Sequence, residues 1–132
     1  MITGIGTDII DIRRIEKALN EKLIARIFTD AEREYCEQKR PGGGHVAAYA
    51  RRFAAKEACA KALGTGIGKT VSFKDIEVTK DENGKPNIKI HSNIPAFQHS
   101  NIHLSMSDDP PYAIAYVVIE KRDKIVYDSY ND

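Results

Sequence analysis

Residues 52–64, RFAAKEACAKALG, are so rich in alanine that the run is best explained as an α-helix. The helical pattern covers residues 45–63, and Gly64 follows at the position where a left-handed cap is common. Glu57 and Lys61 stand one turn apart on this predicted helix, a spacing that stabilises a helix by about 0.2 to 0.5 kcal/mol. Any fold for this chain therefore has to accommodate one long helix that carries a charged pair among its alanines.

The other segments divide into a strand and helices before this run, and strands after it. Residues 1–8 alternate apolar with small or polar side chains and predict a strand that ends near Asp8. Apolar residues at steps of three and four over 11–28 predict one or two amphipathic helices, and Thr29 and Glu32 have the spacing of a capping box that begins another. After the long helix the period changes to two. The predicted strands are residues 72–79, 87–90, 102–107 and 112–121, with a turn at 81–86 and a short helical or irregular link at 94–100.

This order of elements predicts the α+β fold class, with a mainly antiparallel sheet packed with the long central helix. A length of 132 residues with 42% hydrophobic side chains predicts a single domain over residues 1–132, in which the tail from about residue 121 is peripheral. Cys36 and Cys59 are too few for a disulfide framework, so we expect free thiols.

Composition also limits the partners and the location. The N-terminus lacks the basic leader of a signal peptide, and no apolar stretch reaches the roughly 18 residues that a membrane span needs. We therefore expect a cytoplasmic protein without a membrane segment. The net charge of +1 argues against general nucleic-acid binding.

Two glycine-rich segments superficially resemble phosphate-binding loops. Residues 64–70, GTGIGKT, follow a helix and are one residue short of the P-loop spacing, and GIGTDI near the start lacks the third glycine of a dinucleotide fingerprint. Neither segment predicts nucleotide binding, and the first is explained as a helix stop and turn. His99 and His103 have metal-ligand spacing for a helix, but His103 begins an alternating run. We therefore expect one surface histidine and one strand histidine.

What remains is Asp8 at a strand end, Glu57 and Lys61 in the long helix, and the glycine-rich turn that follows. One or two carboxylates together with substrate phosphates suit Mg²⁺, and a lysine with exposed backbone N–H groups would hold phosphate charge. Spacing alone leaves two other interpretations open. In a non-catalytic binding module, Asp8 would cap a helix and Glu57 would pair with Lys61. The same carboxylates could also serve a different metal-dependent phosphotransferase or hydrolase.

Four longer segments carry a more specific signal. They are GIGTDIIDIRRI at 4–15, RFAAKEACAKALGTGIG at 52–68, NGKP at 83–86 and HLSMSDDPPYAIAYVVIE at 103–120. Together they resemble the holo-acyl-carrier-protein synthases, the short bacterial type of 4′-phosphopantetheinyl transferase. The resemblance implies an enzyme of fatty acid biosynthesis that uses Mg²⁺ and coenzyme A to modify an acyl carrier protein. It also implies a homotrimer with active sites at the subunit interfaces.

The resemblance assigns roles to single residues. Asp8 of GTDI and Glu57 of AAKEA match the metal-binding and catalytic carboxylates of the family. The residues that match coenzyme A contacts are Lys61, Gly64, Gly66, Pro86, His103 and Ser105. Where some members carry a second histidine, this chain has Ser107 and Asp108, and we assign no catalytic work to that position.

The implied reaction is attack by a carrier-protein serine on a phosphorus of coenzyme A, with release of 3′,5′-ADP. Mg²⁺ and Lys61 would offset charge on the pyrophosphate, while Glu57 would accept the serine proton directly or through a metal-bound water. Residues 13–26 carry five basic and two acidic side chains. Because the carrier proteins of this family are acidic, the resemblance implies that this face docks them. The predicted docking residues are Arg14, Lys17 and Lys22.

Overall fold

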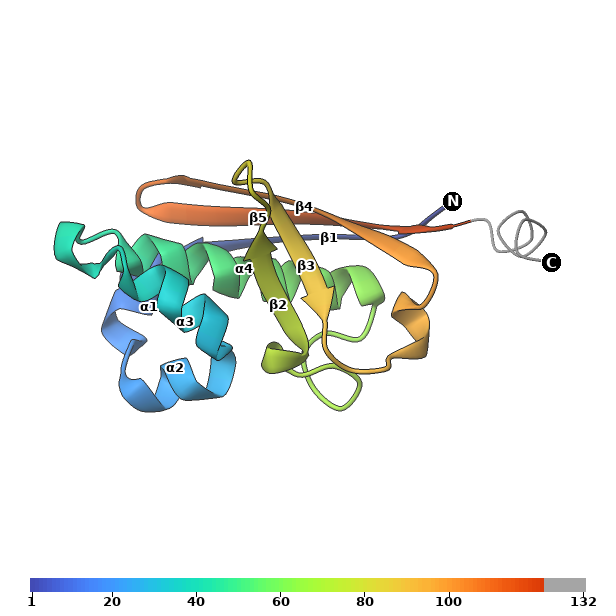
Figure 1. Cartoon of the computed structure of the whole chain (residues 1–132), viewed down its shortest axis with the longest axis horizontal. Helices are drawn as coiled ribbons and strands as arrows, with labels where there is room; N and C mark the ends of the chain where they lie inside the picture. Colours follow the sequence, from blue (N-terminus) through green and yellow to red (C-terminus); the bar gives the residue numbers. More distant parts are fainter. Residues whose placement is uncertain (123–132) are drawn as a thin grey trace.

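A computed structural model describes residues 1–122 of the 132-residue chain. Its main sheet is antiparallel, with three strands in the order β1-β5-β4. These strands are β1 (Ile2–Asp11), β5 (Tyr112–Lys121) and β4 (Ser100–Asp109). A separate antiparallel hairpin joins β2 (Ile76–Lys80) to β3 (Pro86–Ile90), and it crosses the direction of the long strands in Figure 1. The α+β class with an antiparallel sheet is confirmed.

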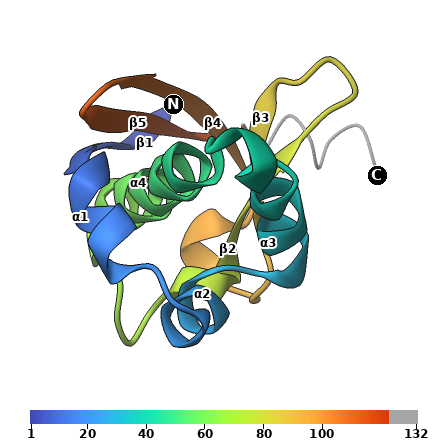
Figure 2. The same cartoon turned by 90° about the vertical axis from the view of Figure 1, so that its left-hand side faces the viewer.

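The described residues form four α-helices, three of which begin at a side-chain cap. The helices are α1 (Ile12–Ala18), α2 (Glu21–Ile27), α3 (Asp30–Glu37) and α4 (His45–Leu63). Asp11, Asn20 and Thr29 accept the capping hydrogen bonds, so the amphipathic pattern over 11–28 is two helices divided at Asn20. Figure 2 shows α4 directly beneath the main sheet, with α1, α2 and α3 arranged around its other sides. Within residues 1–122, every helix is too short or too polar to span a bilayer.

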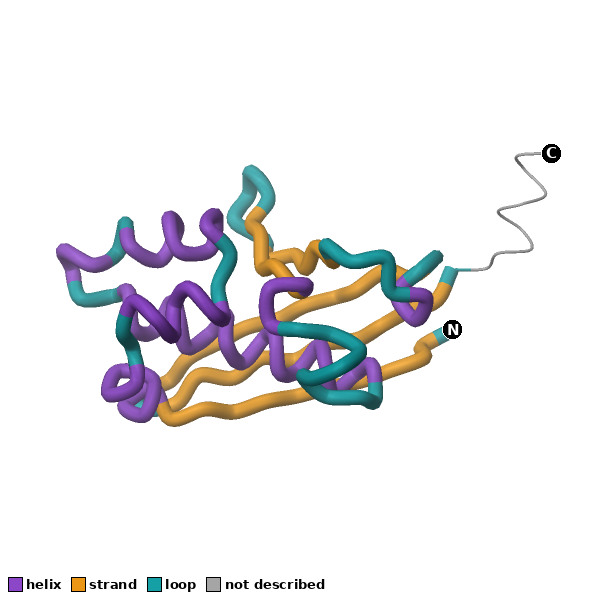
Figure 3. The backbone as a smooth tube through the Cα atoms, turned by 90° about the horizontal axis from the view of Figure 1, so that it is seen from below, coloured by secondary structure: helices purple, strands orange, loops and turns teal. Residues whose placement is uncertain are grey.

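Strand β1 and helix α4 approach so closely that only glycine fits on the strand. A Cβ atom at Gly4 would lie 2.0 Å from the backbone oxygen of Ala62, and one at Gly6 would lie 1.9 Å from that of Ala58. The backbone of β1 therefore rests directly on the backbone of α4, and Figure 3 shows α4 running along the long strands. The glycines of GIGTDI serve helix–sheet packing, which explains their presence without a bound nucleotide.

A buried ion pair ties α4 to α3 and to the hairpin. The Nζ of Lys56 lies 2.7 Å from Oε1 of Glu32, and both side chains are fully buried. Lys56 also donates to the backbone oxygens of Phe73 and Ile76, while Glu32 accepts a backbone N–H from β2. Because buried charges require partners and hydrogen bonds, this network fixes α4, and with it the next residue Glu57, against its surroundings.

Some predicted boundaries were wrong for reasons that lie in the tertiary structure. The first strand, expected to end near Asp8, continues to Asp11 because β1 stays paired with β5 to that point. The strand expected over 72–79 begins only at Ile76, since a 3₁₀ turn with its own capping box precedes it. The predicted peripheral tail, residues 123–132, lies outside the described residues.

Candidate active site

Asp8 and Lys61 meet where β1 crosses the C-terminal half of α4. The Nζ of Lys61 lies 2.9 Å from Oδ1 of Asp8 and 3.2 Å from the backbone oxygen of Thr7. The Asp8 side chain is 16% exposed, whereas that of Lys61 is 53% exposed. The contact follows from the close packing of β1, because Asp8 continues the row of alternate strand residues, Gly4 and Gly6, that face α4.

Glu57 belongs to the same group of charges. Burial raises the pKa of Glu57, the negative charge of Asp8 raises it further, and Lys61 acts in the opposite direction. Within residues 1–122, the carboxylate that pairs with Lys61 is Asp8 and not Glu57, so helix pairing does not account for Glu57. Asp8 does not cap a helix either, because Asp11 caps α1. Both structural features expected of the non-catalytic module were therefore wrong.

A pocket of 420 Å³ opens beside Asp8 and Glu57. Its polar wall also contains Arg14 and Arg26. The apolar wall includes Ile10, Ile15, Leu23, Ile27, Phe53 and Phe73. The structure therefore places one predicted docking residue, Arg14, in the wall of the pocket that also contains the two carboxylates.

Arg26 and Phe53 were not predicted as site residues. Arg26 belongs to the basic segment 13–26, which was expected to dock the carrier protein, and the structure places it in the pocket wall with the two carboxylates. Phe53 stands one helical turn before Glu57, which was the available signal, and its ring stacks on Phe73 with centroids 5.6 Å apart. These residues make the pocket partly cationic and partly apolar.

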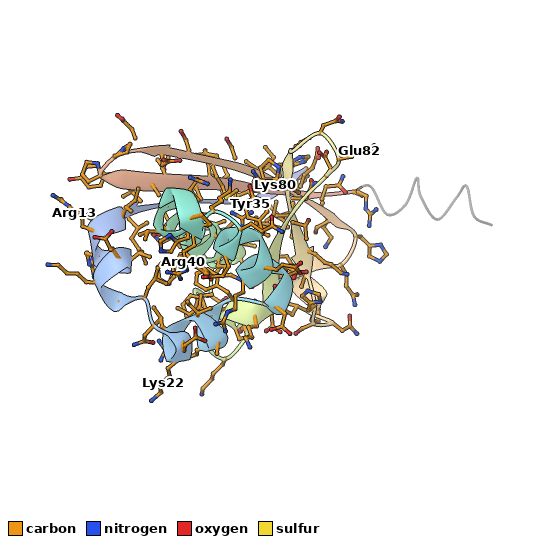
Figure 4. The ribbon with its side chains drawn as sticks, turned by 60° about the vertical axis from the view of Figure 1, so that its left-hand side comes forward. Arg13, Lys22, Tyr35, Arg40, Lys80 and Glu82 are labelled. Carbon is orange, nitrogen blue, oxygen red and sulfur yellow. The ribbon has the colours of Figure 1, made fainter. Side chains whose placement is uncertain are left out.

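The other two predicted docking residues do not line this pocket. Lys17 lies on α1 and Lys22 on α2, and both are exposed. Figure 4 shows Lys22 extending outward from α2 and Arg13 extending outward from α1. Arg13 donates two hydrogen bonds of 2.9 and 2.7 Å to the carboxylate of Asp11, so its charge is partly offset. Lys17 and Lys22 thus extend the basic surface away from the pocket.

The glycine-rich turn begins three residues after Lys61, at Gly64, and folds back on the end of α4. Gly64 caps the helix with φ +92°, and Gly66 has φ +68°. The N–H of Gly66 donates to the backbone oxygen of Ala60 at 3.1 Å. Both positions need the left-handed backbone conformation that glycine adopts without strain, which confirms the interpretation as a helix stop and turn.

His103 and Ser105 lie on the face of the main sheet opposite to Asp8. Ser105 and Thr7 are paired with the same residue of β5, so they point to one side, whereas Asp8 points to the other. His103 is 56% exposed, and its Nε2 lies 3.1 Å from a carboxylate oxygen of Glu120. Within one chain, these two residues are separated from the carboxylates by the sheet itself.

His103 instead shares a groove with the NGKP segment. The groove has a volume of 500 Å³ and is lined by Lys85 and Asn87, which flank Pro86. His99 precedes β4 with φ +59°, so the two histidines do not share a helical face, as predicted. Across the part of the chain that the structure describes, no three His, Cys, Asp or Glu side chains are grouped as a metal site. Cys36 and Cys59 are free and buried.

Comparison with known proteins gives a consistent result. The family model described as the 4′-phosphopantetheinyl transferase superfamily matches residues 4–117. A holo-[acyl-carrier-protein] synthase of Bartonella bacilliformis is 50% identical, over 91% of this chain and 96% of the relative. The crystal structure of a holo-(acyl-carrier-protein) synthase from Bacillus anthracis in complex with CoA (3′,5′-ADP) is 45% identical, with a TM-score of 0.79 over 92% of this chain and 99% of that one. The Helicobacter pylori synthase in complex with coenzyme A is 36% identical, with a TM-score of 0.77 over 88% of this chain and 99% of that one.

Proposed function

The chain belongs to the 4′-phosphopantetheinyl transferase superfamily and, within it, to the holo-[acyl-carrier-protein] synthases, and on that premise we propose that it transfers 4′-phosphopantetheine from coenzyme A to a serine of an apo acyl carrier protein. The released product is 3′,5′-ADP. The observation that carries the proposal is the meeting of Asp8 and Lys61 beside Glu57, on two elements held in backbone contact. Phosphoryl transfer depends on such positioned charge more than on covalent chemistry by the protein.

We propose that Asp8 and Glu57 hold Mg²⁺. Their oxygen atoms are hard donors. Burial raises the pKa of Glu57 and the negative charge of Asp8 raises it further, so a cation beside the two groups would stabilise both in the ionised form. A pair of carboxylates suits Mg²⁺ better than a cation that needs a full protein cage, because Mg²⁺ keeps several waters and shares its coordination with substrate phosphates. When bound, Mg²⁺ would offset the charge that develops on the pyrophosphate.

The remaining predicted residues would bind coenzyme A. Lys61 is the flexible and exposed cation of the group, so it would hold phosphate charge next to the carboxylates. The turn after Lys61 would offer backbone N–H groups to the same ligand. Pro86, His103 and Ser105 are proposed as further contacts, and the groove that His103 shares with the neighbours of Pro86 supports a common role for His103 and Pro86.

We propose that the protein assembles as a homotrimer with interfacial active sites. The outer face of the main sheet, on the side away from α4, exposes large apolar side chains that a monomer would leave in water. Ile9 of β1 is 63% exposed and Tyr116 of β5 is 47% exposed. Their exposed apolar neighbours on the two strands include Ile5, Tyr112 and Ile114. Since His103 and Ser105 lie on this same face, a second copy covering it would bring them to an interface.

The acyl carrier protein is proposed to dock on α1 and α2. Arg14 lines the pocket beside the carboxylates, and Lys17 and Lys22 extend the basic surface beyond it. An acidic partner would be steered to this surface and oriented so that its serine enters the pocket. The apolar wall of the pocket gives a docked segment something to bury once it has been oriented.

The family resemblance also leads us to propose the biological setting. The chain would act as a single 4′-phosphopantetheinyl transferase domain in the cytoplasm and supply holo acyl carrier protein to fatty acid biosynthesis.

The proposed activity is tested by incubating the protein with coenzyme A, Mg²⁺ and an apo acyl carrier protein. Intact-mass spectrometry should show that the carrier protein gains the mass of one phosphopantetheine group, and a carrier protein whose acceptor serine is replaced by alanine should gain nothing. Chelation of Mg²⁺ should stop the gain, and added Mg²⁺ should restore it. No gain with several carrier proteins and a folded enzyme would refute the proposal, while turnover of coenzyme A without any carrier protein would favour a hydrolase.

A further inference from the structure

Lys61 binds Asp8, which is one of the two proposed metal ligands. Its Nζ donates hydrogen bonds to Oδ1 of Asp8 and to the backbone oxygen of Thr7, so the ammonium group binds one charged and one neutral oxygen at the same time. A divalent cation bound by Asp8 would compete for that carboxylate with the ammonium group. One of the two cations has to leave Asp8, or share it at the expense of mutual repulsion.

The surrounding structure determines which partner can move. Asp8 follows a strand segment whose backbone touches α4 at Gly4 and Gly6, so the strand has no room to shift inward. Glu57 follows Lys56, whose buried pair with Glu32 anchors this part of the helix. Lys61, in contrast, holds its charge on a flexible four-carbon stem that is more than half exposed. The lysine head group is the mobile part of the cluster.

Charge balance couples this movement to the phosphates of the substrate. Asp8, Glu57 and Lys61 together carry a single net negative charge when all three are ionised. A divalent cation added to this group turns the net charge positive, and displaced Lys61 is then left without a counter-ion. A pyrophosphate next to Lys61 would supply that counter-ion, so the metal and the phosphates should bind better together than either does alone.

We propose that Lys61 is an exchangeable counter-ion, which holds Asp8 before the ligands arrive and moves to the phosphates when a divalent cation takes its place. This inference rests on the proposed function for the identity of the phosphate ligand. Through the exchange, Lys61 discourages the binding of metal alone and links it to the binding of coenzyme A. Its role is thus to couple two ligands as well as to bind one of them.

The test is a complete set of four affinities, with Mn²⁺ as a spectroscopic substitute for Mg²⁺. Electron paramagnetic resonance counts free Mn²⁺ with and without coenzyme A, and calorimetry measures coenzyme A with and without Mn²⁺. In the wild type each ligand should raise the affinity of the other about fivefold or more, by the same factor in both directions. In Lys61→Met, Mn²⁺ alone should bind about two- to fivefold tighter, as expected when a partly exposed ion pair no longer has to be broken. Coenzyme A should bind more weakly, and the coupling should fall toward one.

Two control variants separate the exchange from a general change of charge. Lys69→Met removes a positive charge from the loop that follows the glycine-rich turn, at a residue with no assigned role. The change in Mn²⁺ affinity that supports the exchange is the amount by which Lys61→Met exceeds Lys69→Met. Lys61→Arg keeps a cation at Asp8, and Mn²⁺ alone should bind to it no more tightly than to the wild type.

The possible failures are distinguishable. If Lys61→Met binds Mn²⁺ no more tightly than Lys69→Met does, or keeps the wild-type coupling, the exchange is refuted while the proposed transferase function stands. If the wild type binds Mn²⁺ but not coenzyme A under any condition, the proposed function fails, and a tighter Mn²⁺ affinity in Lys61→Met would still support the displacement step. Wild-type protein that binds no divalent cation with or without coenzyme A overturns both.

Discussion

Replacing Gly6 with alanine should damage both the stability of the fold and the geometry of the carboxylates. The new Cβ atom would lie 1.9 Å from the backbone oxygen of Ala58 and 2.7 Å from the backbone nitrogen of Ala62. Ordinary contacts need about 3.5 Å, so β1 and α4 would have to separate locally by about 1.5 Å. No side chain can relieve the clash by rotating, because both obstructing atoms belong to the backbone of α4. We therefore expect a loss at or above the upper end of the usual range for overpacking, about 3 kcal/mol.

The loss can be measured by thermal and urea unfolding. For a chain of this size each kcal/mol lowers Tm by roughly 3 to 6 °C, so Gly6→Ala should lower it by roughly 9 to 18 °C. Below that Tm, the folded fraction should bind Mn²⁺ more weakly, since Asp8 is two residues from the displaced contact. Gly42→Ala is the matched control, because a Cβ there meets nothing within 4 Å. A Gly6→Ala protein as stable as the Gly42→Ala control would show that the β1–α4 contact adjusts easily, and the structural explanation of the GIG segment would then be wrong.

Four further predictions address the site and its support. Glu57→Ala should abolish transfer but leave Tm within a few degrees or raise it, because alanine favours the helix and repulsion by Asp8 is removed; retained turnover at saturating Mg²⁺ would contradict the metal role. Lys56→Met should lower the free energy of unfolding by about 3 to 5 kcal/mol in urea titrations, since it leaves a buried carboxylate unpaired, and a loss below about 1 kcal/mol would argue against this anchor. Arg14→Glu combined with Lys22→Glu should raise KM for the carrier protein at least about tenfold, with little change in KM for coenzyme A, and the wild-type KM should rise with salt; equal changes for both substrates would place docking elsewhere. His103→Ala should raise KM for coenzyme A more than it lowers kcat, and unchanged coenzyme A kinetics would exclude the proposed contact.

Local patterns predicted the elements whose signals are contained within a few residues. The alanine-rich run became α4 with Gly64 as its cap, and the Thr29 and Glu32 pair became a reciprocal capping box at the start of α3. Alternation over residues 102–107 predicted β4, which is longer than its pattern suggested, and β5 was predicted over residues 112–121, where it is found. These successes share a cause, because helix caps and strand periodicity depend on neighbours in the sequence.

The errors concern properties that depend on contacts between distant segments. Asp8 was a possible helix cap because nothing local shows that β1 continues to Asp11 along β5. Lys61 was a possible partner of Glu57 because the spacing is favourable, but β1 brings Asp8 within 2.9 Å and the lysine pairs there instead. The glycines of β1 were correctly not assigned to a nucleotide loop, but no local pattern showed their packing role. Their function becomes visible only when the backbone of α4 is placed against them.

Strand β5 contains a signal that the sequence analysis did not use. A strand of an antiparallel sheet with one solvated face should alternate apolar and polar residues, yet YAIAYVVIEK is apolar at almost every position. The structure buries one set of alternate side chains against α4 and leaves the other set, including Ile114 and Tyr116, exposed. A strand with apolar side chains on both faces is expected to pack against other elements on both faces. Within residues 1–122, β5 is packed only on the face that contacts α4. His103 and Ser105 lie on the uncovered face, whereas Asp8 lies on the covered one. If all of them contact one coenzyme A molecule, as the family resemblance implies, two copies of the chain have to supply them, and the apolar face of β5 is the surface through which those copies would meet.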